Sequence, residues 1–155
     1  NSKDYLSEAN SIVDKINIDD ALKKHKNGNT LFIDVRDSAD ISNTGTILNC
    51  LRIPRGMIEF AADELSPLHD VRLSREKEIV LVCGAGGMAA LTGKTLIEMG
   101  YTNIKNLGAI GDAGIITTNK KNLASKIQKL REYGWKKRYI SSSKGFNSIV
   151  NNWAL

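Results

Sequence analysis

Cysteine is scarce in this 155-residue chain, and long hydrophobic runs are absent. The two cysteines, Cys50 and Cys83, are too few for a disulfide framework, and no CxxC or Cys/His spacing predicts a metal site. No apolar stretch is long enough to cross a bilayer, so no contact with a membrane is expected. We therefore expect a soluble globular protein without a signal peptide, in the cytoplasm rather than the periplasm.

Acidic residues are nearly absent from the last quarter of the chain. Residues 119–155 hold nine Lys or Arg and one acidic residue, a net charge of +8, whereas residues 1–118 hold 13 basic and 16 acidic residues, a net of −3. No recognisable motif accompanies the basic residues, so nucleic acid is not expected as a partner. We predict one domain at 1–118 and a basic extension at 119–155 with a helix at 119–133, for which an acidic protein is a candidate partner.

Short apolar runs alternate with helical patterns along residues 12–108. Strands are predicted at 12–16, 31–35, 51–54, 78–83 and 104–107. Helices are predicted from Asp19 or Asp20 to Lys26, at 57–65 and at 88–100. This alternation predicts an α/β fold with a central, mainly parallel sheet of about five strands and helices on both faces. Ligands of such folds bind beyond the carboxyl ends of the strands, where Asp34, Arg36 and Cys83 stand.

Cys83 ends the most apolar predicted strand and precedes a glycine-rich turn, Gly84-Ala85-Gly86-Gly87, and a predicted helix. Such a turn can direct several backbone N–H groups at the sulfur, and the helix N-terminus adds partial positive charge. Both effects favour a thiolate over a thiol. The same amides, from Gly84 through Met88, would also hold an anionic persulfide. Cys83 is therefore predicted to be a nucleophile.

Two other motifs involve these residues. Gly84-x-Gly86-x-x-Ala89 matches the dinucleotide-binding fingerprint, although the next strand does not end in the acid that a nucleotide site requires. A nucleotide-binding α/β protein is therefore kept as an alternative. A cysteine phosphatase would need an arginine at the end of the loop, where Met88 stands, so phosphoryl chemistry is disfavoured. Gly93-Lys94-Thr95 is similar to the end of a P-loop but falls within the predicted helix, which indicates chance.

Four segments together resemble the rhodanese (thiosulfate sulfurtransferase) family over residues 12–108. They are Leu31-Phe32-Ile33-Asp34-Val35-Arg36-Asp37, Arg52-Ile53-Pro54 with the preceding turn Gly45-Thr46-Ile47, the strand and loop at 80–87, and the helix and strand at 94–104. The resemblance implies a rhodanese-like fold in which Cys83 takes a sulfane sulfur from thiosulfate or a persulfide donor. It then passes the sulfur to a thiol or to cyanide. It implies no cofactor beyond the persulfide sulfur on Cys83.

The chain departs from the family pattern in its loop. Family loops usually carry arginine at the Met88 position, so binding of anionic thiosulfate is expected to be weaker here. Arg55 is the candidate cation from another loop. Asp34 and Arg36 are expected to order the strand end and its neighbouring loops. The missing arginine also leaves a second hypothesis open, a catalytically weak rhodanese-fold module that binds or regulates a partner.

Residues 105–148 resemble a fragment of the pyridoxal-phosphate sugar aminotransferases. The resemblance is carried by residues 105–114, 130–135 and 145–148. In that family the lysine matching Lys105 forms the Schiff base. Nothing upstream in this chain resembles the part that binds the cofactor ring and phosphate, so pyridoxal chemistry is not expected.

Overall fold

The computed structural model describes residues 1–109, Asn122, residues 135–137 and residues 140–141. Strands β6 (Trp135–Lys137) and β7 (Ile140–Ser141) form an antiparallel pair. Asn122 is helical, and the rest of the helix predicted at 119–133 lies outside the described residues. No helix in the described part of the chain is long and apolar enough to cross a membrane.

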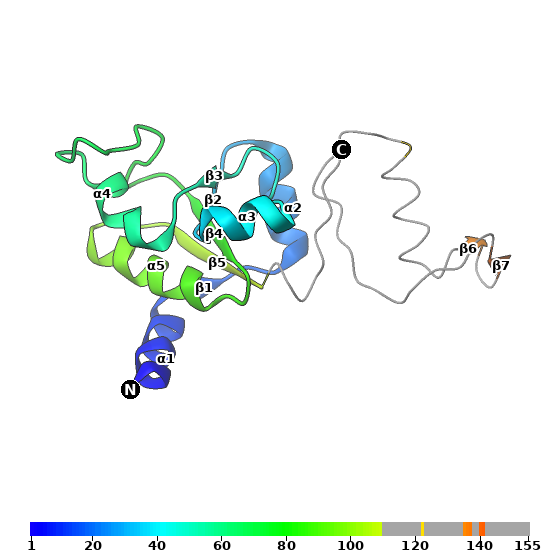
Figure 1. Ribbon diagram of the computed structural model, residues 1–155, viewed down its shortest axis with the longest axis horizontal. Coiled ribbons are helices and arrows are strands. Elements are labelled where there is room, and N and C mark those ends of the chain that lie inside the picture. The colour runs from blue at the N-terminus through cyan, green and yellow to red at the C-terminus, as the bar shows by residue number, and fades with distance from the viewer. Residues whose placement is uncertain (110–121, 123–134, 138–139, 142–155) are drawn as a thin grey trace.

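A five-stranded sheet forms the centre of residues 1–109 (Figure 1). Its strands are β1 (Asp14–Lys15), β2 (Leu31–Asp34), β3 (Leu51–Arg52), β4 (Ile79–Cys83) and β5 (Ile104–Ala109). They lie in the order β1-β5-β4-β2-β3, and every pair is parallel. The central strand β4 is buried along its whole length, as its continuous apolar run predicts. The predicted α/β fold with a five-stranded parallel sheet is confirmed.

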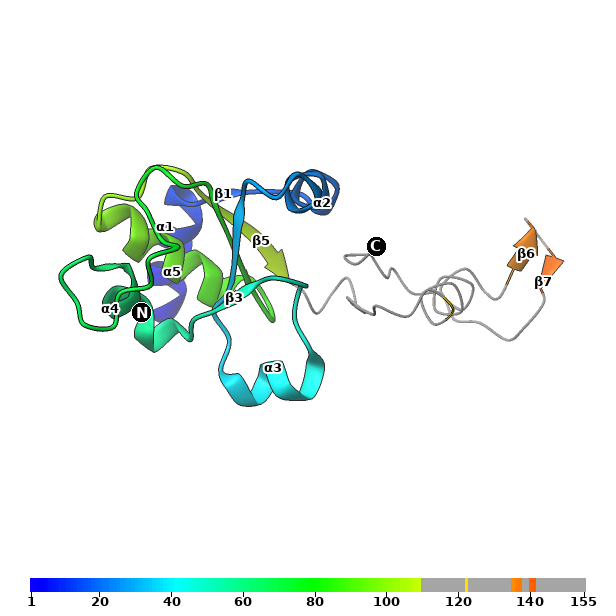
Figure 2. The same ribbon diagram turned by 90° about the horizontal axis from the view of Figure 1, so that it is seen from above.

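Helices cover both faces of the sheet. They are α1 (Ser2–Ile12), α2 (Ile18–Asn27), α3 (Ser38–Thr44), the 3₁₀ turn η1 (Arg55–Met57), α4 (Ile58–Ala62) and α5 (Gly87–Glu98). Figure 2 shows α1, α4 and α5 on one side of the sheet and α2 on the other. The sequence pattern predicts neither α1 nor α3, because each buries a single residue, Ala9 and Ile41 respectively, and so lacks an apolar stripe.

The alternation of side chains along β4 divides the core in two. Leu81 and Cys83 belong to the hydrophobic cluster that contains Ala89 of α5. Val82 belongs to the cluster on the other face, with Ala21 of α2. Because successive residues of a strand point to opposite faces, the register of β4 determines that the Cys83 side chain lies on the α5 side.

Several predicted boundaries are wrong: β3 ends at Arg52 and not at residue 54, and α4 ends at Ala62 and not at residue 65. Helix α2 is capped by Asn17, whose side chain accepts a hydrogen bond from the Asp20 N–H at 2.9 Å, so the predicted caps Asp19 and Asp20 lie in the first turn. The strand predicted at 12–16 contains only Asp14–Lys15, because α1 extends to Ile12. At its other end α2 runs to Asn27, one residue beyond the predicted end, and the chain leaves it through Gly28 at φ +72°.

The triplet Gly93-Lys94-Thr95 lies in the middle of α5, so it does not form a phosphate-binding loop. Gly93 is required there because a Cβ atom at this position would lie 2.8 Å from both methyl carbons of Val13. Lys94 forms an ion pair with Glu8 of α1 at 2.8 Å, and its ammonium lies 4.7 Å from the Tyr5 ring centroid. These residues therefore attach α1 to α5.

Candidate functional site

The Cys83 side chain lies at the carboxyl end of β4, below the loop that leads into α5. The residue is 1% exposed. Its sulfur accepts two backbone hydrogen bonds, from the Gly86 N–H at 3.1 Å and from the Ala89 N–H at 3.4 Å. Two backbone N–H groups at the start of α5 therefore converge on one sulfur, as the glycine-rich turn predicts.

The loop residues differ in exposure and conformation. Gly84, Ala85 and Met88 are exposed, whereas Gly86 is buried. Gly86 has φ +81°, a left-handed conformation that costs glycine little and directs its N–H back at Cys83. The N–H groups of Gly87 and Met88 donate to no acceptor in the described part of the chain. They are therefore free to bind a further anionic atom at the start of α5.

The side chain of Asn106 on β5 supports the loop at 84–88, and the sequence pattern did not identify it as a site residue. Its side chain is almost fully buried and donates from Nδ2 to the Gly86 carbonyl at 3.1 Å. Its Oδ1 accepts from the Gly108 N–H at 2.7 Å. A polar residue within a predicted buried strand is itself a signal, because buried amides need partners. Asn106 therefore fixes the peptide group between Gly86 and Gly87, which directly follows the N–H that donates to the Cys83 sulfur.

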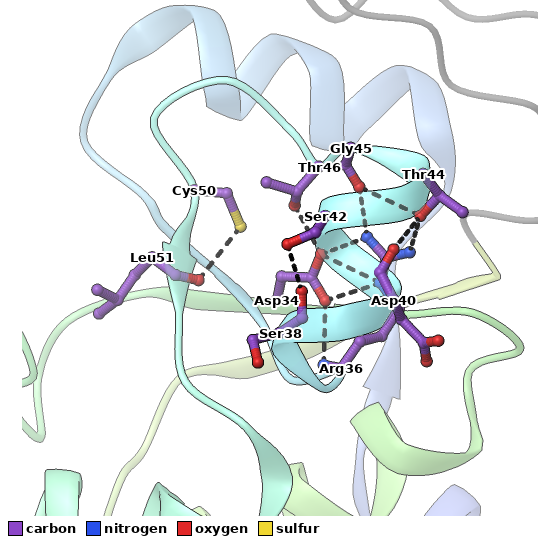
Figure 3. A network of polar contacts seen from close by, with 10 residues as sticks. All are labelled: Asp34, Arg36, Ser38, Asp40, Ser42, Thr44, Gly45, Thr46, Cys50 and Leu51. Carbon is purple, nitrogen blue, oxygen red and sulfur yellow. Dashed lines mark hydrogen bonds and ion pairs between the residues drawn. The ribbon is translucent and has the colours of Figure 1, made fainter.

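Asp34 and Arg36 form a buried network at the carboxyl end of β2 (Figure 3). The Arg36 guanidinium donates to both carboxylate oxygens of Asp34, with the shortest contact at 2.7 Å. It also donates to the Thr44 hydroxyl and to the Gly45 carbonyl, each at 2.7 Å. The Thr46 hydroxyl donates to Asp34 at 2.6 Å. This network connects β2 with the end of α3 and the segment that leads to β3.

The network pairs the Arg36 cation with the Asp34 carboxylate. Its hydrogen bonds to Asp34 raise the pKa of the guanidinium above its ordinary value against the effect of burial, and the charges of Asp34, Asp40 and Cys83 add to the increase. Arg36 therefore remains a cation paired with Asp34. These contacts support the predicted ordering role of both residues.

Arg55, the other predicted cation, is directed away from the loop. Its guanidinium donates to Glu59 at 2.8 Å and to the Thr95 hydroxyl at 3.0 Å. Thr95 lies eight residues after Gly87 in α5, about 12 Å along the helix at 1.5 Å per residue. The structure therefore brings Cys83 and the 84–88 loop together with Asp34 and Arg36 nearby, and ties Arg55 to α4 and α5.

Met88 is the second residue of α5, and its side chain is exposed and uncharged. It is 36% exposed and follows directly on the glycine loop. Neither Met88 nor Ala89 carries a guanidinium, so the loop lacks the bidentate clamp of phosphoryl chemistry. Among the described residues, no group of three His, Cys, Asp or Glu side chains could hold a metal ion.

Cys50 lies outside the loop, between α3 and β3. Its thiol points at the Leu51 carbonyl at 3.5 Å, and burial raises its pKa to about 12, with the Asp34 charge adding to the increase. Because this pKa is raised, the thiol is neutral at every pH well below 12. At pH 9 only about a thousandth of Cys50 would be thiolate, the form that reacts.

We therefore expect native Cys50 to resist alkylation. In a Cys83→Ser chain at pH 8–9, iodoacetamide should label Cys50 about 100-fold more slowly than in the same chain unfolded in urea. Peptide mapping by mass spectrometry measures both rates. Equal labelling in the folded and unfolded chains would contradict a thiol kept neutral by its position against the core.

Lys105 lies on β5, opposite Asp14 of β1, as the sequence predicts for a residue of this strand. Its ammonium forms an ion pair with the Asp14 carboxylate at 2.7 Å, which also lowers the pKa of Asp14. A Schiff base requires a neutral amine, and the described residues around Lys105 form a cavity of about 380 Å³ without an aromatic side chain. These residues do not fit a pyridoxal cofactor.

Part of the chain is similar to sugar aminotransferases. The DegT/DnrJ/EryC1/StrS aminotransferase family model matches residues 80–154. The erythromycin biosynthesis sensory transduction protein EryC1 of Saccharopolyspora erythraea is 46% identical over 47 residues, which are 30% of this chain and 13% of that protein. A dTDP-3-amino-3,4,6-trideoxy-alpha-D-glucose transaminase of Streptomyces venezuelae is 36% identical over 59 residues, 38% of this chain and 16% of that protein. The match therefore spans about one sixth or less of these relatives.

Solved structures resemble the chain over a larger share. A protein of unknown function from Rhodopseudomonas palustris, described as a possible tyrosine phosphatase, is 32% identical with a TM-score of 0.68 over 72% of this chain and 86% of that chain. The 30 kDa polysulfide-sulfur transferase homodimer of Wolinella succinogenes is 28% identical, with a TM-score of 0.55 over 70% of this chain and 77% of that chain. The human single-domain sulfurtransferase, 23% identical, shares the fold with a TM-score of 0.55 over 61% of this chain and 88% of that chain.

The family model of the rhodanese-like domain matches residues 17–109. This match includes β2 to β5, the loop at 84–88 and Cys83, and it ends where the sheet ends. It covers more than half of the chain, and the fold is similar to that of the structural neighbours. The chain belongs to the rhodanese-like domain family.

Proposed function

We propose that this protein is a sulfurtransferase that carries sulfane sulfur as a persulfide on Cys83. The observation that carries the proposal is the pair of N–H groups, from Gly86 and Ala89, that converge on the Cys83 sulfur at the start of α5. Donors fixed by the fold stabilise an anionic sulfur without reorganising during the reaction. The polysulfide-sulfur transferase of Wolinella succinogenes, named for sulfur transfer, supports the same class of activity.

The loop has donors for the second sulfur as well as the first. Gly86 and Ala89 already donate to Sγ, whereas the Gly87 and Met88 N–H groups have no acceptor among the described residues. A persulfide places its negative charge on the terminal sulfur, one bond beyond Sγ. The free amides at the first turn of α5 are the donors available to that atom. A dinucleotide would need the Gly86 amide, which Cys83 already uses.

The reaction has two displacement steps. In the first, the Cys83 thiolate attacks the outer sulfur of the donor, the Sγ–S bond forms, and the donor S–S bond breaks. The donor leaves as a thiolate, or as sulfite if it was thiosulfate. In the second, an acceptor thiolate or cyanide attacks the terminal sulfur, the Sγ–S bond breaks, and the Cys83 thiolate returns. Dividing the transfer in this way lets donor and acceptor bind in turn.

The proposal is tested by intact mass. The full chain, incubated with a small-thiol persulfide and then desalted, should gain the mass of one sulfur atom. Cyanide should remove that sulfur as thiocyanate, which is measured by its coloured iron complex. A chain that gains no sulfur from either a persulfide or thiosulfate would contradict the proposal and favour the alternative of a non-catalytic binding module.

Asn106 is expected to act as a positioning residue for this chemistry. Replacing it with alanine removes the hydrogen bond to the Gly86 carbonyl, so the 86–87 peptide group is no longer fixed and the loop around the Gly86 N–H loosens at its Cα. We expect the loading rate at saturating donor to fall about 10- to 100-fold with little change in the donor concentration at half-saturation. Rapid-quench mass spectrometry of sulfur loading measures both quantities.

Asn103, which precedes β5 at the end remote from the loop, provides the matched control. Asn103→Ala should load sulfur like the parent chain. A purely structural role for Asn106 would instead lower the melting temperature while leaving the loading rate of the folded fraction unchanged.

A further inference from the structure

The sulfur donor of this site carries little charge. We propose that it is a persulfide or polysulfide of a thiol, and not the thiosulfate dianion, because Met88 leaves the loop without an unpaired cation. This inference rests on the proposed persulfide chemistry of Cys83 and narrows its substrate class. The charges that decide it are those around the loop in the described part of the chain.

The cations on the elements around Cys83 are already paired. The elements packed against β4 are β2, β5 and α5. Arg36 at the end of β2 pairs with Asp34 at 2.7 Å. Lys105 of β5 pairs with Asp14 at 2.7 Å, and Lys94 of α5 pairs with Glu8 at 2.8 Å. Each of these positive charges is therefore matched by a carboxylate, and the loop itself contains no charged residue.

Arg55 does not change this balance. Its two terminal nitrogens are used by Glu59 and Thr95, the second of which lies two turns into α5. Moving the guanidinium to the loop would break an ion pair and a hydrogen bond. A sulfur donor that binds at the loop therefore contacts backbone N–H groups and the exposed thioether of Met88.

The backbone N–H groups and the Met88 thioether discriminate between donors because the two reactions bring different numbers of negative charges into the loop. Attack of the Cys83 thiolate on thiosulfate gathers three negative charges in the loop and must expel the sulfite dianion. Attack on an ionised persulfide gathers two and expels a thiolate with a single charge. Backbone dipoles at one helix N-terminus correspond to about half a positive charge, so they cannot compensate for the additional anion. An apolar thioether beside the sulfonate oxygens would remove water from them without replacing it.

The test compares two donors on three chains. The second-order rate constant for sulfur loading of Cys83 is measured by rapid-quench intact mass with thiosulfate and with the persulfide of 2-mercaptoethanol, whose organic part is uncharged. In the parent chain we expect the persulfide to load Cys83 at least about 100-fold faster, as for two charge-assisted contacts that thiosulfate lacks here. In Met88→Arg the ratio of thiosulfate to persulfide loading should increase about 10- to 100-fold, because the new guanidinium can bind the sulfonate in bidentate fashion.

Met88→Gln is the matched control, since it adds polarity at the same position without charge. Its loading ratio should stay within about threefold of the parent, the change expected of a surface substitution. Equal loading of the parent by both donors, or an unchanged ratio in Met88→Arg, would overturn this inference and leave the proposed function intact. Failure of both donors to load Cys83 would overturn the proposed function and this inference together.

Discussion

Replacing Cys83 with serine should abolish sulfur loading. The parent chain should gain one sulfur atom from a small-thiol persulfide, and the variant should gain none. Serine keeps the size of the side chain and the loop amides, but its hydroxyl is neither an anion near neutral pH nor a sulfur nucleophile. We expect the loading rate to fall by at least about 10³-fold, as for loss of a covalent nucleophile. Intact mass before and after cyanide treatment measures the loss.

Cys50→Ala is the matched control for this prediction. Its thiol lies outside the loop and is kept neutral by burial, so this variant should load sulfur like the parent. Sulfur found on Cys50 in the Cys83→Ser chain would contradict the assignment of the nucleophile. Loss of loading in both variants would instead indicate that the two cysteines act together.

Replacing Arg36 with methionine should cause the largest loss of stability among these variants. The guanidinium forms an ion pair with Asp34 at 2.7 Å, and Asp34 is fully buried. The substitution leaves that carboxylate without its cation in the interior. We expect the free energy of unfolding to fall by about 3–5 kcal/mol, a large part of the stability of an ordinary domain. Urea denaturation followed by circular dichroism measures the change.

Two variants test the cause of this loss. Arg72→Met removes an arginine whose pair with Asp70 is similar in length, 2.6 Å, but whose side chain is 61% exposed, so it should cost only about 0–1 kcal/mol. The double variant Asp34→Leu/Arg36→Met removes both buried charges and should recover part of the stability. A double variant less stable than Arg36→Met would show that the Asp34 carboxylate stabilises the segment between α3 and β3 through its hydrogen bond with Thr46, without needing the Arg36 cation.

The sheet could be predicted from the sequence because its strands are marked by composition. The runs at Leu31–Asp34 and Ile79–Cys83 are apolar on both faces, which only a strand covered on both sides requires. The glycine-rich sequence after Cys83 likewise predicted a turn, and Gly86 adopts φ +81° there. In contrast, α1 has no apolar stripe, and it is stabilised by the capping box of Asn1 and Asp4 and by packing against α5.

The sequence by itself therefore determined the fold class, the position of Cys83 at the end of a buried strand and the absence of a cation in its loop. These properties depend on local composition and on residue spacing. The tertiary structure alone decided which side chains support the loop. Asn106 reaches the Gly86 carbonyl from a strand 20 residues further along the chain, and Arg55 points at Thr95 from 40 residues away. The physical reason is that a hydrogen bond depends on distance and angle in space, which the order of residues along the chain does not record.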